Sequence, residues 1–400
     1  MNKHLLFVLF ASLLGFIFLV SCEKILPPLP AEEELLDGPI EGLTNAENLR
    51  FLRGDIAFND DVFTPATGLG PLFIATSCGG CHPGDGKGHP FTTLTRFGQS
   101  DTSGNQFLHL GGPQLQHRAL PGFEPENIPL GASFSKFTPP ANTGLGLLEA
   151  VPDADLLAWA DPDDTNGDGI SGRPNWIGLP QYLTPKEGAV SQNGLYIGRF
   201  GKKAGVHNLL QQTANAYNQD MGITSIFAPF DTYSQLEMDP EVSTATVQDV
   251  VFYLQTLKAP IQRNPSSTDV EAGQQLFSQI KCNACHRPEM QTGHSPIAAL
   301  TNRRIYPYTD LLLHDMGADL DDGYTEGRAL TSEWRTPPLW GLGLSKNSQG
   351  GQYFLLHDGR AHSIEEAILY HGGEALVSRE KFQQLSSLEK QQLITFLESL

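Results

Sequence analysis

The chain has 400 residues and a formal net charge of −19 at pH 7, because 45 acidic residues outnumber 26 lysines and arginines. A surface of this sign repels phosphate, which argues against nucleic acid as a partner. The 41 glycines and 28 prolines indicate long irregular loops, and the ordinary apolar content excludes a disordered chain.

The first 22 residues, MNKHLLFVLFASLLGFIFLVSC, have a basic start, an apolar run and a small residue before a cysteine, as in a secretory signal. The ending Leu19–Cys22 resembles the bacterial lipobox. That resemblance implies a signal peptide over residues 1–21, cleavage before Cys22, lipid on Cys22, and a tether over residues 22–44. A retained membrane anchor is the alternative. We expect a lipid-anchored protein on the periplasmic side of a bacterial cell envelope.

Two C-x-x-C-H motifs lie two hundred residues apart, and they account for every cysteine except Cys22. This motif is the attachment signature of c-type haem, in which the two thiols bind the porphyrin and the histidine binds the iron. A thioredoxin-like site needs no adjacent histidine, and a zinc site does not require histidine after both pairs. The sequence predicts two covalent c-type haems, one at Cys78, Cys81 and His82 and the other at Cys282, Cys285 and His286.

Helical patterns surround the second motif. Residues 269–285 run as a helix into it, and residues 385–400 form an amphipathic helix with Ser387 as its expected cap. A similar closing helix over residues 246–260 precedes a linker. This plan resembles the small cytochrome c fold. We expect a mainly α chain of two cytochrome c-like haem domains with long irregular loops, an N-terminal domain with insertions over residues 45–264 and a C-terminal domain over residues 265–400.

Six stretches carry a further resemblance: GDGISGRPN, GRFGKKA, DMGITS, PYTDLLLHDMG, EWRTPPLWGLG and LHDGRAHSIEEAILYHGGEA. With these, nearly the whole mature chain resembles the bacterial di-haem oxidoreductases, also labelled thiol oxidoreductases. That family is related to the di-haem cytochrome c peroxidases and to the di-haem enzyme that matures methylamine dehydrogenase. The resemblance implies a redox function but does not identify the substrate.

Residues 198–222 resemble the peroxidase segment that follows a Gly-Arg pair, here Gly198 and Arg199. The resemblance implies that an acid and a glutamine reach the open face of haem 1, the N-terminal haem. The acid falls on Asp220 and the glutamine on Gln211 or Gln212. Together with Arg199 these are the candidate catalytic residues, because splitting a peroxide requires proton transfer near the iron. The alternative is that Asp220 caps a turn and the glutamines lie on a solvated helix face.

Tyr196 stands where the peroxidases have a tryptophan two residues before the Gly-Arg pair, and it is either an electron relay or a core residue. The second iron ligand of haem 1 is left open by the sequence. His89, His109 and His117 lie downstream of the first motif, but none stands in a recognisable pattern. A vacant position would fit a peroxide-binding iron.

Haem 2, at the second motif, has a candidate for its second ligand. In the relatives this ligand follows a His-Asp-Gly sequence, and the register places it on His371, which makes haem 2 bis-histidine. The segment SIEEAILYH is expected to be helical, with Ser363 as N-cap and Glu366 completing a capping box. Met316 is the competing ligand. His314 and His357 are interpreted as structural histidines.

The segment DDTNGDGISG places Asp164, Asn166 and Asp168 at alternating positions, as in the first half of an EF-hand loop. Asn175 replaces the closing glutamate, so a calcium site would need ligands from other segments. A turn stabilised by Asp and Asn side chains without metal is the alternative.

The predicted function is that of an exported di-haem oxidoreductase, peroxidase-like, in which haem 2 relays electrons to a reactive haem 1. Its expected partners are a small redox protein, peroxide or another small oxidant, and the membrane through Cys22. The alternative is a di-haem electron carrier without catalytic activity, in which both irons have two protein ligands.

Overall fold

The structure is a computed structural model that describes residues 30–400. The predictions of a signal peptide over residues 1–21 and of lipid on Cys22 lie outside the described residues. Residues 30–35 contain a single 3-10 turn at Glu32–Glu34, and residues 36–400 form one compact unit.

Within residues 30–400 the chain forms ten α-helices. The helices are α2 (Asn45–Asn59), α3 (Leu145–Glu149), α4 (Asp153–Trp159), α5 (Leu209–Met221), α6 (Thr244–Thr256), α7 (Thr268–Gln279), α8 (Ser345–Ser348), α9 (Ile364–Leu369), α10 (Leu376–Gln384) and α11 (Ser387–Ser399).

Short strands join the helices and pair antiparallel in small sheets. These sheets are β1 (Leu72–Phe73) with β3 (Arg118–Ala119), β2 (Leu94–Gly98) with β4 (Ser133–Phe137), β5 (Trp176–Ile177) and β6 (Ser191–Gln192) on either side of β7 (Leu195–Ile197), β8 (Met290–Gln291) with β9 (Arg304–Ile305), and β10 (Leu313–Asp315) with β11 (Glu333–Arg335). The content is therefore mixed, and the prediction of a mainly α chain holds only in part. Much of the remainder is irregular, as the glycine and proline content predicts.

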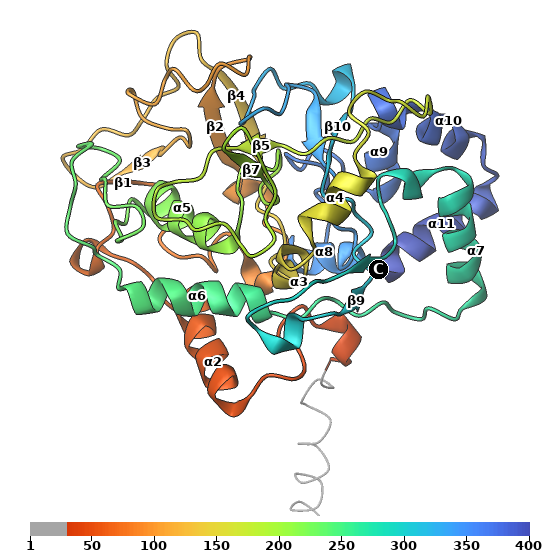
Figure 1. Cartoon of the computed structure of the whole chain (residues 1–400), viewed down its shortest axis with the longest axis horizontal. Helices are drawn as coiled ribbons and strands as arrows, with labels where there is room; N and C mark the ends of the chain where they lie inside the picture. Colours follow the sequence, from red (N-terminus) through yellow and green to blue (C-terminus); the bar gives the residue numbers. More distant parts are fainter. Residues whose placement is uncertain (1–29) are drawn as a thin grey trace, which may run out of the picture. The chain divides into compact units, whose positions relative to one another are not determined.

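The first closely packed helix pair is formed by α2 and α6, which lie beside each other in Figure 1. Gly54 of α2 allows the close approach, since a Cβ atom there would lie 2.6 Å from the Cβ of Tyr253. The predicted closing helix over residues 246–260 is confirmed as α6. The helix α2, by contrast, was not predicted from the sequence.

The second pair repeats this arrangement around the second C-x-x-C-H motif. Helix α7 runs into that motif and packs against α11 (Figure 1), with Gly273 at the crossing, where a Cβ would lie 2.6 Å from the Cβ of Phe396. Both predicted helices are confirmed. The predicted cap is wrong by one residue: Ser386 is the N-cap of α11, and its side chain and that of Glu389 form the capping box.

Two large clusters of buried apolar side chains accompany these pairs. One contains Phe51 and Tyr253 from α2 and α6, and the other contains Phe277 and Phe396 from α7 and α11. The predicted domain boundary at Asn264 falls between α6 and α7 and stays a prediction. Among the residues that the structure describes, no helix is long and apolar enough to span a bilayer.

Candidate haem sites

The first motif forms a tight turn in which the backbone N–H groups of Cys81 and His82 both donate to the carbonyl of Cys78, over 3.0 and 3.1 Å. The Nδ1 atom of His82 donates to the carbonyl of Pro140 over 2.9 Å. Burial lowers the pKa of His82 to about 4, so its imidazole is neutral. The ring of Phe58 lies beside it, with ring centres 6.0 Å apart.

The second motif has the same local geometry. A 3-10 turn over Cys282–Ala284 starts after Lys281, and the backbone N–H of His286 donates to the carbonyl of Cys282 over 3.0 Å. The Nδ1 atom of His286 donates to the carbonyl of Tyr308 over 3.0 Å. Burial lowers the pKa of His286 to about 4.

Both motif histidines are thus oriented by a backbone carbonyl on Nδ1, which leaves Nε2 for a metal, as is usual for metal-binding histidines. Burial raises the pKa of Cys78 and of Cys282 to about 12, as expected for thiols held away from water. Across residues 30–400 no group of three or more His, Cys, Asp or Glu side chains is arranged to hold a metal ion. The two thiols and the oriented histidine of each motif are the groups that covalent attachment of haem requires.

His371 lies opposite His286, with ring centres 6.5 Å apart and an angle of 44° between the ring planes. Two imidazoles bonded to one iron from opposite sides, each over about 2 Å, have ring centres roughly 6 Å apart. The Nδ1 atom of His371 donates to the carbonyl of Ala367 over 2.8 Å, so its Nε2 is also available. The arrangement fits an iron held between the two rings.

The sequence placed His371 at the end of a helix, and it lies two residues beyond the end of α9. Ser363 is the N-cap of α9, as predicted. The Glu366 side chain instead accepts from the backbone N–H of His362, over 2.7 Å, so the predicted capping box does not form. Met316, the competing ligand, packs against a separate apolar cluster that contains Trp334.

Asp220 lies near the end of α5, close to the first motif. Its backbone carbonyl accepts from Ile74 and Ala75, over 2.6 and 3.1 Å, which ties α5 to the segment before the motif. Its charge raises the pKa of both Cys78 and Cys81, although burial is the larger cause for each. Burial raises the pKa of Asp220 itself to about 7, and the charge of Arg96 acts in the opposite direction.

Arg96 was not identified from the sequence. It stands on β2, and its guanidinium contacts Glu326 over 2.7 Å and the side-chain oxygens of Gln114 and Gln219 over 3.3 Å each. Burial alone would lower the pKa of Arg96, but the charges of Glu326 and other neighbours outweigh it, so the group stays cationic. A fixed positive charge therefore lies beside the candidate acid.

The predicted glutamines do not lie with Asp220. Eight or nine residues of α5 separate them from it, a distance of about 12 to 14 Å along the helix axis. The Gln211 side chain accepts from the backbone N–H of His207 over 2.9 Å, and Gln212 is half-buried. Of these three predicted residues, the structure places Asp220 with the first motif.

Arg199 is fully buried and pairs with Asp153, and it also donates to the carbonyl of Leu148 over 2.9 Å. These contacts join α3 and α4 to the segment after β7. They account for the Arg199 side chain as a packing residue.

The other candidates near haem 1 are also dispersed. His109 and His117 are exposed, and the His89 ring packs between Phe91 and Phe354, with ring centres 4.5 and 4.8 Å away. Tyr196 is half-buried on β7 and packs edge-on against His207. None of these positions suggests a second ligand for His82.

A charged cluster beside haem site 2 was missed in the sequence. His314 bonds to Asp310 over 2.8 Å and to Glu374 over 2.7 Å, and its Nδ1 also lies 3.5 Å from the sulfur of Cys285. Burial lowers the pKa of His314, but the charge of Asp310 and the other contacts outweigh it and raise the pKa well above its ordinary value. This histidine therefore lies between two carboxylates and against the attachment cysteine, a setting that favours its charged form.

In the loop predicted to bind calcium, the side-chain oxygens accept hydrogen bonds from the backbone. Asp164 accepts from Gly169 over 3.2 Å, Asn166 from Asp168 over 2.8 Å, and Asp168 from Ile170 over 2.9 Å. These contacts form turns of the kind that Asp and Asn side chains stabilise without metal. Calcium at this loop stays a prediction.

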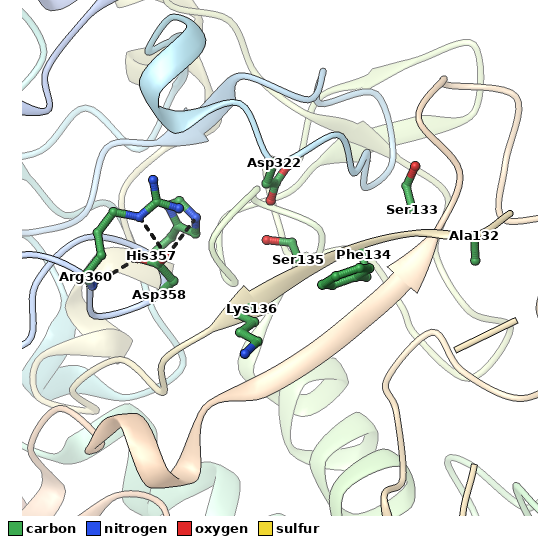
Figure 2. A pocket seen from close by; sticks show the side chains of 9 residues that line it. All are labelled: Ala132, Ser133, Phe134, Ser135, Lys136, Asp322, His357, Asp358 and Arg360. Carbon is green, nitrogen blue, oxygen red and sulfur yellow. Dashed lines mark hydrogen bonds and ion pairs between the residues drawn. The ribbon is translucent and has the colours of Figure 1, made fainter. Parts of the chain in front are cut away.

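A pocket of 390 Å³ opens on β4 (Figure 2). In Figure 2 Arg360 lies beside Asp358, to which its Nε donates over 2.8 Å. The His357 ring, which also lines the pocket, stacks on Trp334 with ring centres 3.7 Å apart. The lining residues are Ala132, Ser133, Phe134, Ser135, Lys136, Asp322, His357, Asp358 and Arg360.

Two half-buried C-x-x-C-H turns, each with a neutral histidine whose Nε2 is available, define a protein built to hold two haems. The comparison with protein families agrees. The family described as "Di-haem oxidoreductase, putative peroxidase" matches residues 136–400, and the chain belongs to this family. Membership supports two haems and a peroxidase-like oxidoreductase function. The match includes the second motif and begins after the first, so the geometry of site 1 rests on this chain alone.

The chain was also compared with solved structures and with curated proteins. Among solved structures, the chain resembles Kuenenia stuttgartiensis hydrazine synthase pressurised with 20 bar xenon, with a TM-score of 0.39 and 13% identity over 94% of this chain and 93% of that one. We base no functional argument on a likeness of this degree. The comparison with curated proteins found no match.

Proposed function

We propose that the protein is an exported di-haem c-type oxidoreductase that reduces peroxide. Cys78 and Cys81 attach haem 1, Cys282 and Cys285 attach haem 2, and His82 and His286 are the iron ligands next to the attachment sites. His371 is the second ligand of haem 2. Haem 2 receives electrons from a small redox protein and passes them to haem 1.

This proposal rests on a difference between the two sites in the side chain that lies near the motif histidine. Site 2 has two histidines whose ring centres lie 6.5 Å apart, a separation that suits an iron with both axial positions filled. At site 1 the motif histidine His82 is accompanied by the carboxyl group of Asp220, whose pKa is raised to about 7 by loss of hydration. A closed iron suits electron transfer, and an open iron beside an acid suits reaction with a small oxidant.

Asp220 is the proton-transfer group in this proposal. When bound, haem 1 supplies the iron and the electrons that reduce the peroxide oxygen. The carboxylate of Asp220 would take the proton from one peroxide oxygen and return it to the other, which would leave as water. Two protons from solvent and the two electrons would convert the remaining oxygen to a second water. A pKa near 7 lets one group both accept and donate a proton at neutral pH. Arg96 keeps enough of this group ionised to act as the base.

Lipid on Cys22 would hold the protein at the bacterial membrane on the periplasmic side, where c-type haem is attached. The apolar run before Cys22 and the two C-x-x-C-H motifs support this location. The strongly acidic net charge favours a redox partner with a basic docking surface.

The test is steady-state reduction of hydrogen peroxide by the holoprotein, with a reduced small cytochrome as electron donor. We expect turnover in the wild type and a loss of about a hundred-fold to ten-thousand-fold in Asp220→Asn, which keeps the shape of the side chain and removes the base. The matched control is Asp163→Asn, since Asp163 is an exposed aspartate and its variant should retain wild-type turnover. Absence of turnover in the wild type, with no iron open to external ligands, would instead indicate an electron carrier.

A further inference from the structure

Three basic residues from distant parts of the sequence are brought together near the two motifs. Lys87 follows the first motif, Lys202 lies in the loop after β7, and Arg335 ends β11. The backbone N–H of Arg335 donates to the carbonyl of Lys202 over 3.0 Å, and Lys87 Nζ lies 3.4 Å from the carbonyl of Leu356. We call Lys87, Lys202 and Arg335 the basic cluster.

The basic cluster has more positive charge than its surroundings neutralise. Asp358 attracts both lysines, but its carboxylate already pairs with Arg360 over 2.8 Å, as Figure 2 shows. The guanidinium of Arg335 donates to the backbone carbonyls of Gly201 and Thr336, over 2.9 and 3.3 Å, which are neutral acceptors. The cluster can therefore accommodate further negative charge.

Loss of hydration makes the charged forms of these three side chains less stable. It lowers the pKa of Lys202 to about 7 and that of Arg335 to about 10, and it lowers the pKa of Lys87 well below its usual value. Mutual repulsion adds to the effect, since Arg335 acts on Lys202 and Lys202 on Lys87. A cation held away from water is unfavourable unless an anion pairs with it.

The basic cluster reaches toward both motifs. Lys87 lies beside site 1, because the backbone N–H of the next residue, Gly88, donates to the carbonyl of Pro139 over 3.0 Å, and the carbonyl of Pro140 accepts from His82. At the other end, the Arg335 guanidinium donates to the carbonyl of Thr336, which also accepts from the hydroxyl of Thr309 over 2.6 Å. Thr309 follows Tyr308, whose carbonyl accepts from His286 over 3.0 Å. An anion in this space would thus lie between the two haem sites.

We propose that the basic cluster binds the propionate carboxylates of the two haems and holds them between the irons. This inference rests on the proposed haem at both motifs. Each haem carries two propionates, so the bound cofactors supply the anions that the protein lacks at this place. The planar guanidinium of Arg335 suits a carboxylate in a fixed orientation, and the lysines act as point charges.

Lys202→Met tests the inference, because methionine is of similar length and carries no charge. Removing the cation leaves a carboxylate unpaired near haem 1, which stabilises the oxidised iron. We expect a shift of the haem 1 reduction potential to lower values in a spectroelectrochemical titration. We also expect the infrared carboxylate bands of haem labelled with carbon-13 in its propionates to shift. Lys202→Arg, which keeps the charge, should restore both signals.

The matched control is Lys136→Met, since Lys136 is an exposed lysine at the rim of the nearby pocket. The inference would be overturned if the haem 1 reduction potential shifts no more in Lys202→Met than in this control. It would also be overturned if the infrared bands of the labelled propionates do not shift. If Lys202→Met does not fold, Lys87→Met gives the same test. Neither readout depends on peroxide turnover, so an inactive protein can still support the basic cluster. Both proposals would be wrong if the protein carried no covalent haem. The intact mass of the protein, measured first, shows whether haem is attached.

Discussion

The pH dependence of peroxide turnover follows from the position of Asp220. Burial raises the pKa of this carboxyl from its usual 3.8 to about 7. If its ionised form is the base, activity is present above this pKa and is lost as the pH falls through it. About half of the molecules carry the base at pH 7, and the fraction falls tenfold for each pH unit well below that. At pH 5, kcat/KM should be about one hundredth of its plateau.

Arg96 provides a second perturbation of known sign. Its positive charge lowers the pKa of Asp220, so Arg96→Gln should raise that pKa further and move the midpoint of the profile to higher pH. Turnover at pH 7 should fall and should recover in more alkaline buffer. Arg96→Lys keeps the charge and should leave the midpoint close to that of the wild type.

The assay is kcat/KM for hydrogen peroxide measured from pH 5 to pH 9 in the wild type and the three variants Asp220→Asn, Arg96→Gln and Arg96→Lys. A purely structural role for Arg96 would lower the plateau without moving the midpoint. The reasoning fails if the wild-type profile has its midpoint near pH 4. It also fails if Asp220→Asn keeps a midpoint near 7, or if Arg96→Gln moves the midpoint to lower pH.

Three further predictions concern ligation, packing and anchoring. His371→Gly should open haem 2, giving a high-spin signal and binding of external ligands, whereas Met316→Ala should leave haem 2 low-spin; the reverse result would make Met316 the ligand. Gly273→Ala should lower the free energy of unfolding by about 1–3 kcal/mol, because the added methyl group overlaps α11 at the crossing. Gly178→Ala, where an added methyl group meets nothing within 4 Å, should change it by less than about 0.5 kcal/mol. Cys22→Ser should move the protein from the membrane to the soluble fraction, and continued membrane retention without N-terminal lipid would refute the lipoprotein prediction.

Local patterns were sufficient for part of this description. The C-x-x-C-H turns, the helices around the second motif and the N-cap Ser363 depend on residues close in sequence, and the structure shows these elements where they were expected. The error of one residue at the cap of α11 has a local cause too, since Ser386 and Ser387 are adjacent and both can cap. His371 could be placed opposite His286 because a family resemblance supplied its register.

The rest depends on contacts between distant segments. Arg96 lies on a short strand 124 residues before Asp220, and nothing in its local sequence marks it as the neighbour of an acid. His314 contacts Glu374, which is 60 residues away in the sequence, and Lys202 contacts Arg335, which is 133 residues away. The separation of Gln211 from Asp220 follows from the axial rise of the continuous helix α5, which the alignment with the peroxidase segment did not take into account.

The central claim is that one iron is closed by His286 and His371 and the other is open beside Asp220. Titration of the oxidised holoprotein with cyanide, followed by electron paramagnetic resonance, tests it most directly. We predict one high-spin and one low-spin iron before addition, and conversion of the high-spin signal with one cyanide bound per protein. Two low-spin irons that bind no cyanide, or two irons that both bind it, would contradict the account.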